Sequence, residues 1–251
     1  MAADKENAAK EIKSVSISVF LPCYNEEANV ANTVKKALAV LDKLYSDYEL
    51  IIVNDGSADR TGQIADQLAA ANPRIKAVHH PKNRGYGGAV QSGIRASTKD
   101  FVFYTDGDGQ FDMGEMPALV PLMRDYDIVS CYRLNRQDPW IRKLNAFCWT
   151  TLVNLVFHMR IRDVDCAFKL YKRQIFDNMQ LRSTGALISA EILARALREG
   201  YKINQKGVHH YPRTAGVQTG AKLSVIIRAF RELFRLRRQI LEDDRNAAGN
   251  A

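Results

Sequence analysis

The sequence predicts an α/β fold with a mostly parallel β-sheet flanked by helices. Short apolar segments alternate with amphipathic segments of helical length through the first half of the chain, which is typical of βαβ units. Polar segments rich in Asp, Asn or Gly directly follow several of the predicted strands. Because ligands of open α/β sheets bind beyond the carboxyl ends of the strands, these polar segments indicate one shared site.

The first elements have the clearest patterns. Residues 15–21 are the first predicted strand, because apolar and β-branched side chains dominate there. A helix is predicted over 25–41, since the acidic pair Glu26-Glu27 in its first turn suits the positive end of a helix dipole. The apolar run 48–54 is the second strand, and the amphipathic segment 59–71 is the second helix.

The same order then repeats. Residues 75–79 are the third predicted strand, and a Gly-rich turn leads into a helix over 86–97. Residues 101–105 are almost wholly apolar, as in a buried strand of a parallel sheet. A helix over 115–124 and a fifth strand over 127–131 complete this part of the pattern.

After the fifth strand the pattern is less regular. Residues 139–158 form a long apolar and aromatic stretch with a few charged residues. A helix is predicted over 186–198 and a short strand over 208–211. Residues 223–241 carry apolar residues at three- and four-residue spacing with basic residues largely on other faces, so they are predicted to form a basic amphipathic helix.

These elements predict one globular domain over 15–221, which includes an amphipathic interfacial segment over 138–160. The basic amphipathic helix follows it, over 222–241. The polar ends of the chain, 1–14 and 242–251, are expected to be disordered tails.

Composition and charge narrow the classes of function. No apolar run reaches the roughly 18 residues that a membrane-spanning helix needs, and the N-terminus lacks the apolar core of a signal peptide, so we expect a cytoplasmic protein. The four cysteines have no zinc-like spacing and are expected to be buried thiols. The net charge is +8, and residues 222–241 carry six Lys or Arg against one Glu, which indicates an anionic partner. No nucleic-acid-binding motif is present, so nucleic acid is not an expected partner.

The segment Asp106-Gly107-Asp108-Gly109-Gln110 follows the fourth predicted strand. Two carboxylates one residue apart can present oxygens to one hard cation, Mg²⁺ or Mn²⁺, which keeps positions open for water and phosphate. The glycines leave room for a diphosphate to approach the backbone. Asp and Gly are also common turn formers, so a solvated turn is the alternative at this point.

Five segments, in family order, resemble the motifs of the family 2 glycosyltransferases of the GT-A fold, and in particular those of the polyprenyl-phosphate (dolichyl-phosphate) hexose synthases. The segments are LPCYNEE at 21–27, VNDGS at 53–57, NRGYGGA at 83–89, DGDGQ at 106–110 and RDVDCAF at 162–168. The resemblance implies a GT-A fold and a transferase that takes mannose or glucose from a nucleotide diphosphate sugar, GDP-mannose or UDP-glucose.

The resemblance also assigns residues to the nucleotide. Pro22, Tyr24 and Glu26 would border it, with the Tyr24 ring for the base and the Glu26 carboxylate for the ribose hydroxyls. Asp55 would accept hydrogen bonds from the base or the ribose, and it could also cap the turn that follows.

The same resemblance places the expected Mg²⁺ or Mn²⁺ ion at Asp106, Asp108 and Gln110. Asp108 and Gln110 would bind the ion directly, and Asp106 would lie on its nucleotide side. The ion would neutralise the departing diphosphate.

The nature of the acceptor decides whether a general base is needed. A lipid phosphate is already anionic, needs no base, and would attack the anomeric carbon with inversion. The resemblance aligns Arg133, Arg213 and Lys222 with basic residues that hold the acceptor phosphate or the donor diphosphate. For an alcohol acceptor, Asp165 or Glu191 could act as the base, although Glu191 is more simply interpreted as a partner that orients Arg133 or Arg213.

Together these implications favour an inverting, metal-dependent transfer of a hexose to a polyprenyl or dolichyl phosphate. The protein would contact the cytoplasmic face of the membrane peripherally, through the segments 138–160 and 222–241. The alternative is a soluble family 2 glycosyltransferase that acts on a hydroxyl of a sugar, a glycolipid or a protein.

Overall fold

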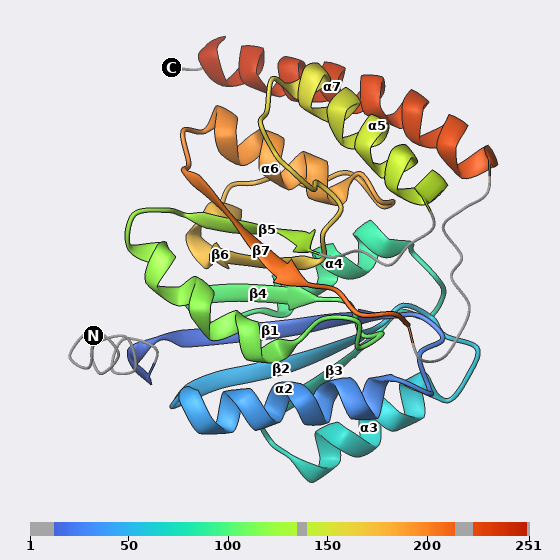
Figure 1. Cartoon of the computed structure of the whole chain (residues 1–251), viewed down its shortest axis with the longest axis vertical. Helices are drawn as coiled ribbons and strands as arrows, with labels where there is room; N and C mark the ends of the chain where they lie inside the picture. The colour runs from blue at the N-terminus through green and yellow to red at the C-terminus, as the bar shows by residue number, and fades with distance from the viewer. Residues whose placement is uncertain (1–12, 135–139, 214–222, 250–251) are drawn as a thin grey trace.

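A seven-stranded β-sheet forms the centre of the protein (Figure 1). The computed structural model describes residues 13–134, 140–213 and 223–249. The strands lie side by side in the order β3-β2-β1-β4-β6-β5-β7. In chain order they are β1 (Ser16–Cys23), β2 (Asp47–Asn54), β3 (Ile75–His79), β4 (Phe101–Thr105), β5 (Ile128–Leu134), β6 (Phe168–Lys172) and β7 (Ile203–His209).

Most strand pairs in the sheet are parallel, which confirms the predicted fold class. Strand β1 pairs in parallel with β2 and β4, β2 pairs in parallel with β3, and β5 pairs in parallel with β7. Among the strands of the described residues, β6 alone runs antiparallel to its neighbours, β4 and β5. Strand β6 was not predicted from the sequence, because Lys169 and Lys172 interrupt the apolar pattern of this short strand.

Helices cover the sheet and extend beyond it. They are α2 (Val30–Leu44), α3 (Thr61–Ala71), α4 (Tyr86–Ala96), α5 (Trp140–Phe157), α6 (Ile188–Arg198) and α7 (Leu223–Gly249), with 3₁₀ segments η1 (Met113–Arg124) and η2 (Arg173–Phe176). The helix predicted from residue 25 begins only at Val30, because the chain first makes a turn in which Asn29 N donates to the carbonyl of Glu26 at 2.9 Å.

The segment after β4 is a 3₁₀ helix rather than the α-helix predicted over 115–124. Pro117 and Pro121 lie inside η1. A proline has no N–H to donate and its ring crowds the preceding turn, so two of them four residues apart disfavour a regular α-helix. The apolar residues of η1 are nevertheless buried against the sheet, as the predicted helix required.

Helix α7 corrects the predicted C-terminal boundary. The helix expected over 222–241 continues to Gly249, so most of the expected tail 242–251 is helical. The side chain of Asp243 explains the continuation, because it accepts hydrogen bonds from Arg182 at 2.7 Å and from Arg195 at 3.0 Å. The predicted N-terminal tail falls almost entirely on residues 1–12, outside the described part of the chain.

Helices α5 and α7 run side by side at one end of the molecule, beyond α6 (Figure 1). The rings of Trp149 and Phe230 join them, with ring centroids 6.0 Å apart. Among the described helices, none has the combination of length and apolar composition that a bilayer span requires. Cys148 of α5 is exposed, which corrects the expectation that all four thiols are buried, whereas the other three cysteines are buried as predicted.

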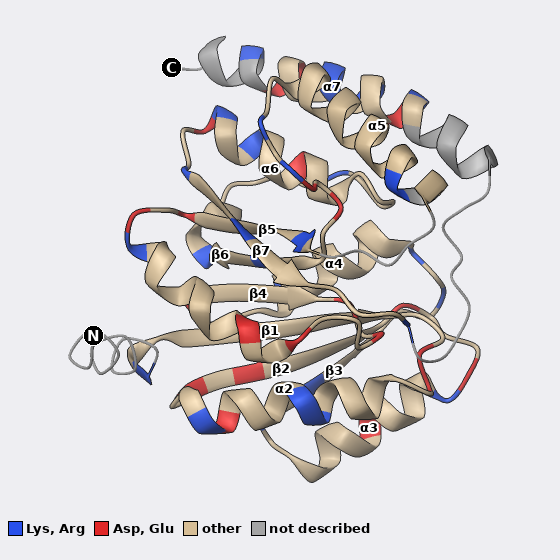
Figure 2. Ribbon diagram, viewed as in Figure 1, with Lys and Arg blue, Asp and Glu red and all other residues tan. Residues whose placement is uncertain are grey.

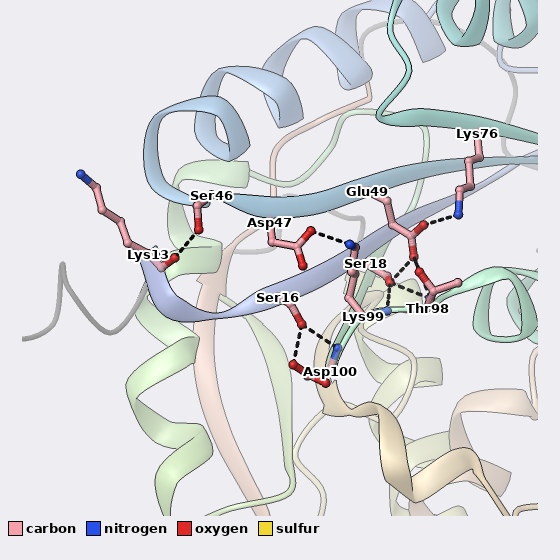
Figure 3. A network of polar contacts seen from close by, with 10 residues as sticks. All are labelled: Lys13, Ser16, Ser18, Ser46, Asp47, Glu49, Lys76, Thr98, Lys99 and Asp100. Carbon is pink, nitrogen blue, oxygen red and sulfur yellow. Dashed lines mark hydrogen bonds and ion pairs between the residues drawn. The ribbon is translucent and has the colours of Figure 1, made fainter.

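A polar network joins the amino ends of the strands, at the edge of the sheet opposite the predicted site (Figure 3). Its central carboxylate, Glu49, is buried and accepts hydrogen bonds from Ser18 Oγ at 2.6 Å, Thr98 N at 2.7 Å and Lys76 Nζ at 2.5 Å. Because several donors converge on this buried charge, the network stabilises the start of β1 and β2.

Candidate active site

The carboxyl ends of β1, β2 and β4 meet at one edge of the sheet, and backbone hydrogen bonds join the loops that follow them. Asp55 N donates to the carbonyl of Cys23 at 2.9 Å, and Gly107 N donates to that of Pro22 at 3.3 Å. Acidic and basic residues lie together in the loops at this edge (Figure 2). The polar segments that follow these three strands therefore share one region of the molecule.

Two glycines allow the segment after β4 to lie against the end of β1. A Cβ atom on Gly107 would lie 2.3 Å from Cys23 Sγ and 3.3 Å from the carbonyl oxygen of Pro22. Gly109 has a φ of +73°, in the left-handed region that favours glycine. This close approach brings the two neighbouring aspartates next to the loop after β1.

Asp106 and Asp108 form a pair of poorly solvated carboxylates. Oδ1 of Asp106 is buried and has no hydrogen-bond partner within the described part of the chain. Burial and then the charge of Asp108 raise the pKa of Asp106, although a hydrogen bond from Tyr86 acts in the opposite direction. Burial also raises the pKa of Asp108, whose Oδ1 accepts from Gln110 N at 3.1 Å. Positive charge at this pair would therefore be favourable.

The donor set fits an Mg²⁺ or Mn²⁺ ion that arrives together with a ligand. Among the described residues, no three or more His, Cys, Asp or Glu side chains gather into a metal cluster. Asp106 and Asp108 supply carboxylate oxygens, and Gln110 Nε2 donates to the carbonyl of Tyr211 at 2.8 Å, which leaves the amide oxygen for a cation. Such ions usually complete their coordination with water and phosphate oxygens.

Arg213 links the expected nucleotide side of the site to the expected metal side. Its Nη2 lies 2.6 Å from Oε1 and 2.7 Å from Oε2 of Glu26, and its Nη1 lies 3.6 Å from Oδ2 of Asp108. The chain just before it is tied to the same loop, because Tyr211 N donates to the carbonyl of Gln110 at 2.8 Å. The structure therefore brings three predicted site residues, far apart in sequence, into direct contact or close to it.

The other residues predicted to border the nucleotide lie at the end of β1. Tyr24 is 43% exposed, so its ring is accessible to a base, whereas Pro22 is buried and contributes its carbonyl to the Gly107 contact. The carboxylate of Glu26 is already engaged by Arg213 and by Asn29 Nδ2 at 2.7 Å. Ribose hydroxyls would therefore share or replace these contacts.

Asp55 is buried and holds the loop after β3. Its Oδ1 lies 2.5 Å from Nδ1 of His80 and accepts from the backbone N of Arg84 at 2.8 Å. The opposite ring nitrogen of His80 lies 2.8 Å from Ser92 Oγ. The alternative role offered by the sequence was to cap the turn after β2, but in that turn Ser57 N donates to Asn54 Oδ1 at 3.1 Å, and Asp55 is bonded to the loop after β3 instead. A role toward the nucleotide remains a prediction.

Arg133, at the carboxyl end of β5, forms a two-point ion pair with Asp163. Its Nε and Nη2 donate to the two carboxylate oxygens at 2.7 Å and 2.8 Å. Burial raises the pKa of Asp163, but Arg133 outweighs this effect and holds that pKa below its ordinary value. The guanidinium is therefore held in one orientation.

Asp165 lies beside this pair, two residues further along the same turn. Burial and the charge of Asp163 raise the pKa of its carboxyl, against opposing contributions from Arg133 and Lys169. A hydrogen bond with Trp149 of α5 also acts on it. Of the two candidate bases, Asp165 is therefore the one whose carboxyl is influenced by the charge of Arg133.

Glu191 does not have its expected role. It is fully buried in α6 and accepts hydrogen bonds from Ser183 N at 2.7 Å, Arg182 N at 3.0 Å and Arg195 Nε at 3.0 Å. The expectation that it orients Arg133 or Arg213 is wrong, because its charge is used to hold the chain that precedes α6. The buried carboxylate and its three donors also make it a poor candidate for a base.

Three residues of this region had no role predicted from the sequence: Tyr86, Asp163 as the partner of Arg133, and Lys169. Tyr86 stands in the Gly-rich motif and Asp163 in the last motif, so both were visible as motif members but had no assigned role. Lys169 lay in the unrecognised strand β6. Lys222, predicted to bind phosphate, lies outside the described residues.

Comparisons with known proteins agree with the sequence motifs. A model of the family described as "Glycosyl transferase family 2" matches residues 18–179. The undecaprenyl-phosphate 4-deoxy-4-formamido-L-arabinose transferase of Aeromonas hydrophila is 35% identical over 184 residues, which are 71% of this chain and 56% of that protein. Glycosyltransferase AglD of Haloferax volcanii is 31% identical over 220 residues, 84% of this chain and 35% of that protein. The chain thus spans about half or less of the length of these two relatives.

Solved structures show the same fold at lower sequence identity. The glucosyl-3-phosphoglycerate synthase of Mycobacterium tuberculosis, in complex with Mn²⁺, UDP and phosphoglyceric acid, superposes with a TM-score of 0.66 and 17% identity over 94% of this chain and 79% of that chain. A complex of the same enzyme with Mn²⁺ and UDP-glucose gives a TM-score of 0.64 at 20% identity, over 94% of this chain and 80% of that chain. The likeness confirms the predicted GT-A fold.

Proposed function

The chain belongs to glycosyl transferase family 2, and from this premise we propose that it transfers a hexose from a nucleotide diphosphate sugar to a polyprenyl phosphate, with inversion at the anomeric carbon. The observation that carries the proposal is the contact of Arg213 with both Glu26 and the Asp108 region. This contact brings three residues together. Glu26 is expected to accept hydrogen bonds from the ribose, Asp108 is an expected metal ligand, and Arg213 is the cation expected to bind phosphate. The names of the curated relatives, which include an undecaprenyl-phosphate sugar transferase, support the lipid acceptor.

The donor would bind over the carboxyl ends of β1 and β4. The exposed ring of Tyr24 can stack on the base, and Glu26 can accept from the ribose hydroxyls. Arg213 would then turn part of its guanidinium toward the diphosphate, since its present partners are carboxylates that the ribose and an ion can engage. The hexose is mannose or glucose in this proposal, carried by GDP or UDP.

Asp106, Asp108 and Gln110 would hold an Mg²⁺ or Mn²⁺ ion with the diphosphate. The unpartnered oxygen of Asp106 and the raised pKa of the Asp106–Asp108 pair support this assignment. When bound, the ion supplies charge neutralisation for the leaving nucleoside diphosphate. The protein contributes the orientation of the carboxylates, through the Gly107 approach and the Gln110 hydrogen bonds.

Arg133 would bind the acceptor phosphate. Asp163 holds the guanidinium by two hydrogen bonds, and the remaining N–H donors of an arginine can still reach a phosphate oxygen. An anionic phosphate oxygen can attack the anomeric carbon without a base, so no proton has to be removed in this step. Arg133 would contribute by orienting the acceptor phosphate for its attack on the anomeric carbon.

We place the protein at the cytoplasmic face of the membrane, in peripheral contact through α5 and α7. Large apolar side chains of both helices are exposed, among them Trp140 (73%), Phe147 (69%) and Phe234 (55%). Basic residues recur along the described part of α7 (Figure 2). Exposed aromatic and basic residues together suit the boundary between lipid chains and anionic headgroups.

A second candidate function is favoured by one observation. The raised pKa of the Asp165 carboxyl, close to Arg133, suits a general base for a hydroxyl acceptor of a sugar, glycolipid or protein. In that case Asp165→Asn would abolish transfer. For a phosphate acceptor, the same variant should retain most of its activity.

A donor screen tests the proposal. The purified protein is incubated with each common nucleotide sugar and Mg²⁺ or Mn²⁺, with and without a short polyprenyl phosphate, and release of nucleoside diphosphate is measured. We expect release that depends on the lipid phosphate, and an inverted anomeric configuration in the product by NMR. No transfer from any donor to the lipid phosphate would contradict the proposal, and transfer to a water-soluble hydroxyl would favour the second candidate.

A further inference from the structure

Lys169 is a fully buried lysine for which the proposed reaction has no role. It lies on β6, opposite Tyr104 of β4 and Ser130 of β5 in the register of the sheet. This position is one strand away from Asp106 and close to the turn that precedes β6. A charged side chain therefore lies in the layer beneath the candidate site.

The ammonium group of Lys169 holds the turn before its own strand. Nζ donates to the carbonyl of Val164 at 3.1 Å and, in a shorter contact, to the carbonyl of Cys166. The same nitrogen lies 5.9 Å from the ring centroid of Tyr104. The turn is also closed by a longer hydrogen bond of 3.4 Å from Cys166 N to the carbonyl of Asp163. The lysine therefore donates to two backbone carbonyls of this turn.

The charge on Lys169 is not explained by packing alone. Burying an ammonium group is costly, and an apolar side chain of similar length would fill the same space without that cost. Three carboxylates lie near enough to respond to it, because Lys169 acts to lower the pKa of Asp106, Asp163 and Asp165. Its hydrogen bonds are made to the turn that carries Asp163 and Asp165, and its effect on Asp106 is weaker than those of burial, Asp108 and Arg133.

The turn that Lys169 holds carries the partner of Arg133. Asp163 begins this turn and fixes the guanidinium of Arg133 through two hydrogen bonds. If the carbonyls of Val164 and Cys166 lost their donor, the turn could move, and the carboxylate of Asp163 would move with it. The path from Lys169 to Arg133 therefore consists of direct contacts.

We propose that Lys169 is a positioning residue for the acceptor side of the site: it holds the Val164–Cys166 turn so that Asp163 keeps Arg133 in place for the anionic group of the acceptor. This inference rests on the proposed function, in which Arg133 binds the acceptor phosphate. It goes beyond that function by assigning a role to a residue that touches neither substrate.

The structural part of the proposal is tested without activity. Lys169→Met keeps the length of the side chain but removes its charge and its hydrogen-bond donors. Lys169→Arg keeps the charge and the donors. We expect hydrogen exchange of the amides at 164–167 to be at least ~10-fold faster in Lys169→Met than in the wild type, with partial recovery in Lys169→Arg. Glu49→Gln, which weakens the fold at the opposite edge of the sheet, is the control for a general loss of stability and should leave this turn unchanged. Wild-type exchange rates in Lys169→Met would overturn the proposal.

Steady-state kinetics test the functional part. In Lys169→Met we expect the KM for the lipid phosphate to rise about 10-fold, while the KM for the nucleotide sugar changes less than about 2-fold, because one charge-assisted contact is weakened on the acceptor side only. Adding Asp163→Asn to Lys169→Met should cost little more than Asp163→Asn alone, since both act through Arg133. Equal changes in the two KM values, or strictly additive effects, would overturn the proposal. If Lys169→Met is too unstable to purify, Lys169→Gln replaces it in both measurements.

The two proposals fail in different ways. If the wild type transfers no sugar to lipid phosphate, the proposed function is wrong, and the exchange measurement still decides whether Lys169 holds the turn. If the wild type transfers sugar and Lys169→Met keeps wild-type KM values, the role of Lys169 is wrong and the function stands.

Discussion

Arg213 and Glu26 stand 187 positions apart in the chain and form a close ion pair, with the arginine Nη2 at 2.6 Å and 2.7 Å from the two carboxylate oxygens. The pair joins the turn after β1 to the segment after β7, and strands β2 to β7 lie between these two segments in the sequence. Neither group is in bulk water, since the side chains are only 15% and 11% exposed. The contact therefore holds two residues of the proposed donor site in a fixed position relative to each other.

The first prediction concerns this pair. Arg213→Ala should lower kcat/KM for the nucleotide sugar by about 100-fold, because a charge-assisted contact to the diphosphate is lost and Glu26 is left buried without its partner. Glu26→Gln removes the same ion pair but keeps a polar side chain for the ribose, and it should cost less. Steady-state kinetics with each variant check the order, and equal losses would show that the pair has only a structural role.

The second prediction concerns the metal. Asp108→Asn should abolish transfer while the protein remains folded, since the change removes a carboxylate charge without changing the size of the side chain. Treatment with EDTA should likewise stop transfer by the wild type, and added Mg²⁺ or Mn²⁺ should restore it. Calorimetric titration of Mn²⁺ in the presence of a nucleoside diphosphate gives a readout independent of turnover. Undiminished ion binding by Asp108→Asn would contradict the metal assignment.

The third prediction separates the roles of Arg133 and Asp163. Arg133→Lys keeps the charge but loses the fork that matches Asp163, so the KM for the lipid phosphate should rise about 10-fold or more. Asp163→Asn keeps Arg133 but frees it from one orientation, and we expect a smaller rise in the same constant. A change confined to the KM for the nucleotide sugar would show that Arg133 acts on the donor and not on the acceptor.

The sequence predicted the parts of this site that depend on local pattern. Asp106, Asp108 and Glu26 could be placed because each follows an apolar strand, and the carboxyl ends of parallel strands meet at one edge. The partners of charged residues could not be predicted in the same way. Glu191 has the residue type of an orienting carboxylate, yet its position in α6 directs it to Ser183 and Arg195.

The antiparallel strand β6 shows a second limit of pattern. Its five residues include two lysines, so neither alternation nor an apolar run marked it as a strand. Lys169 is buried only because β4 and β5 enclose it from both sides, and such pairing is a property of the whole sheet. For the same reason, the role of Lys169 in holding the Val164–Cys166 turn could not be predicted from the sequence.

The fourth prediction concerns acid stability. Burial raises the pKa of Glu49, but hydrogen bonds from Lys76, Ser18 and Thr98 outweigh it, so the folded-state pKa lies below the ordinary 4.5 (Figure 3). A depressed carboxyl pKa stabilises the fold fully above about pH 4.5, and this stabilisation is lost as the pH falls through the folded-state value. We therefore expect Glu49→Gln to lower the free energy of unfolding by about 1–3 kcal/mol at pH 7.

Urea denaturation between pH 3 and pH 7 checks this fourth prediction. The difference between the wild type and Glu49→Gln should shrink as the pH falls below about 4.5. A difference that stays constant over the whole range would show that the charge of Glu49 contributes nothing to stability.

The last prediction concerns the surface of α5 and α7. Phe147 and Phe234 are 69% and 55% exposed, although phenylalanine is normally buried, and their helices touch through Trp149 and Phe230. A double variant, Phe147→Ser with Phe234→Ser, should bind vesicles of anionic lipid more weakly by about 10-fold or more, because each buried ring contributes roughly 1.5–3 kcal/mol.

The matched control for this last prediction is Leu197→Ser, which changes an exposed apolar residue of α6 and should bind like the wild type. Flotation at low salt and at about 0.5 M salt, roughly three times physiological ionic strength, separates the apolar from the electrostatic share of binding. If the double variant and the control float equally well, the exposed rings of α5 and α7 do not face the membrane, and the acceptor must reach Arg133 by another path.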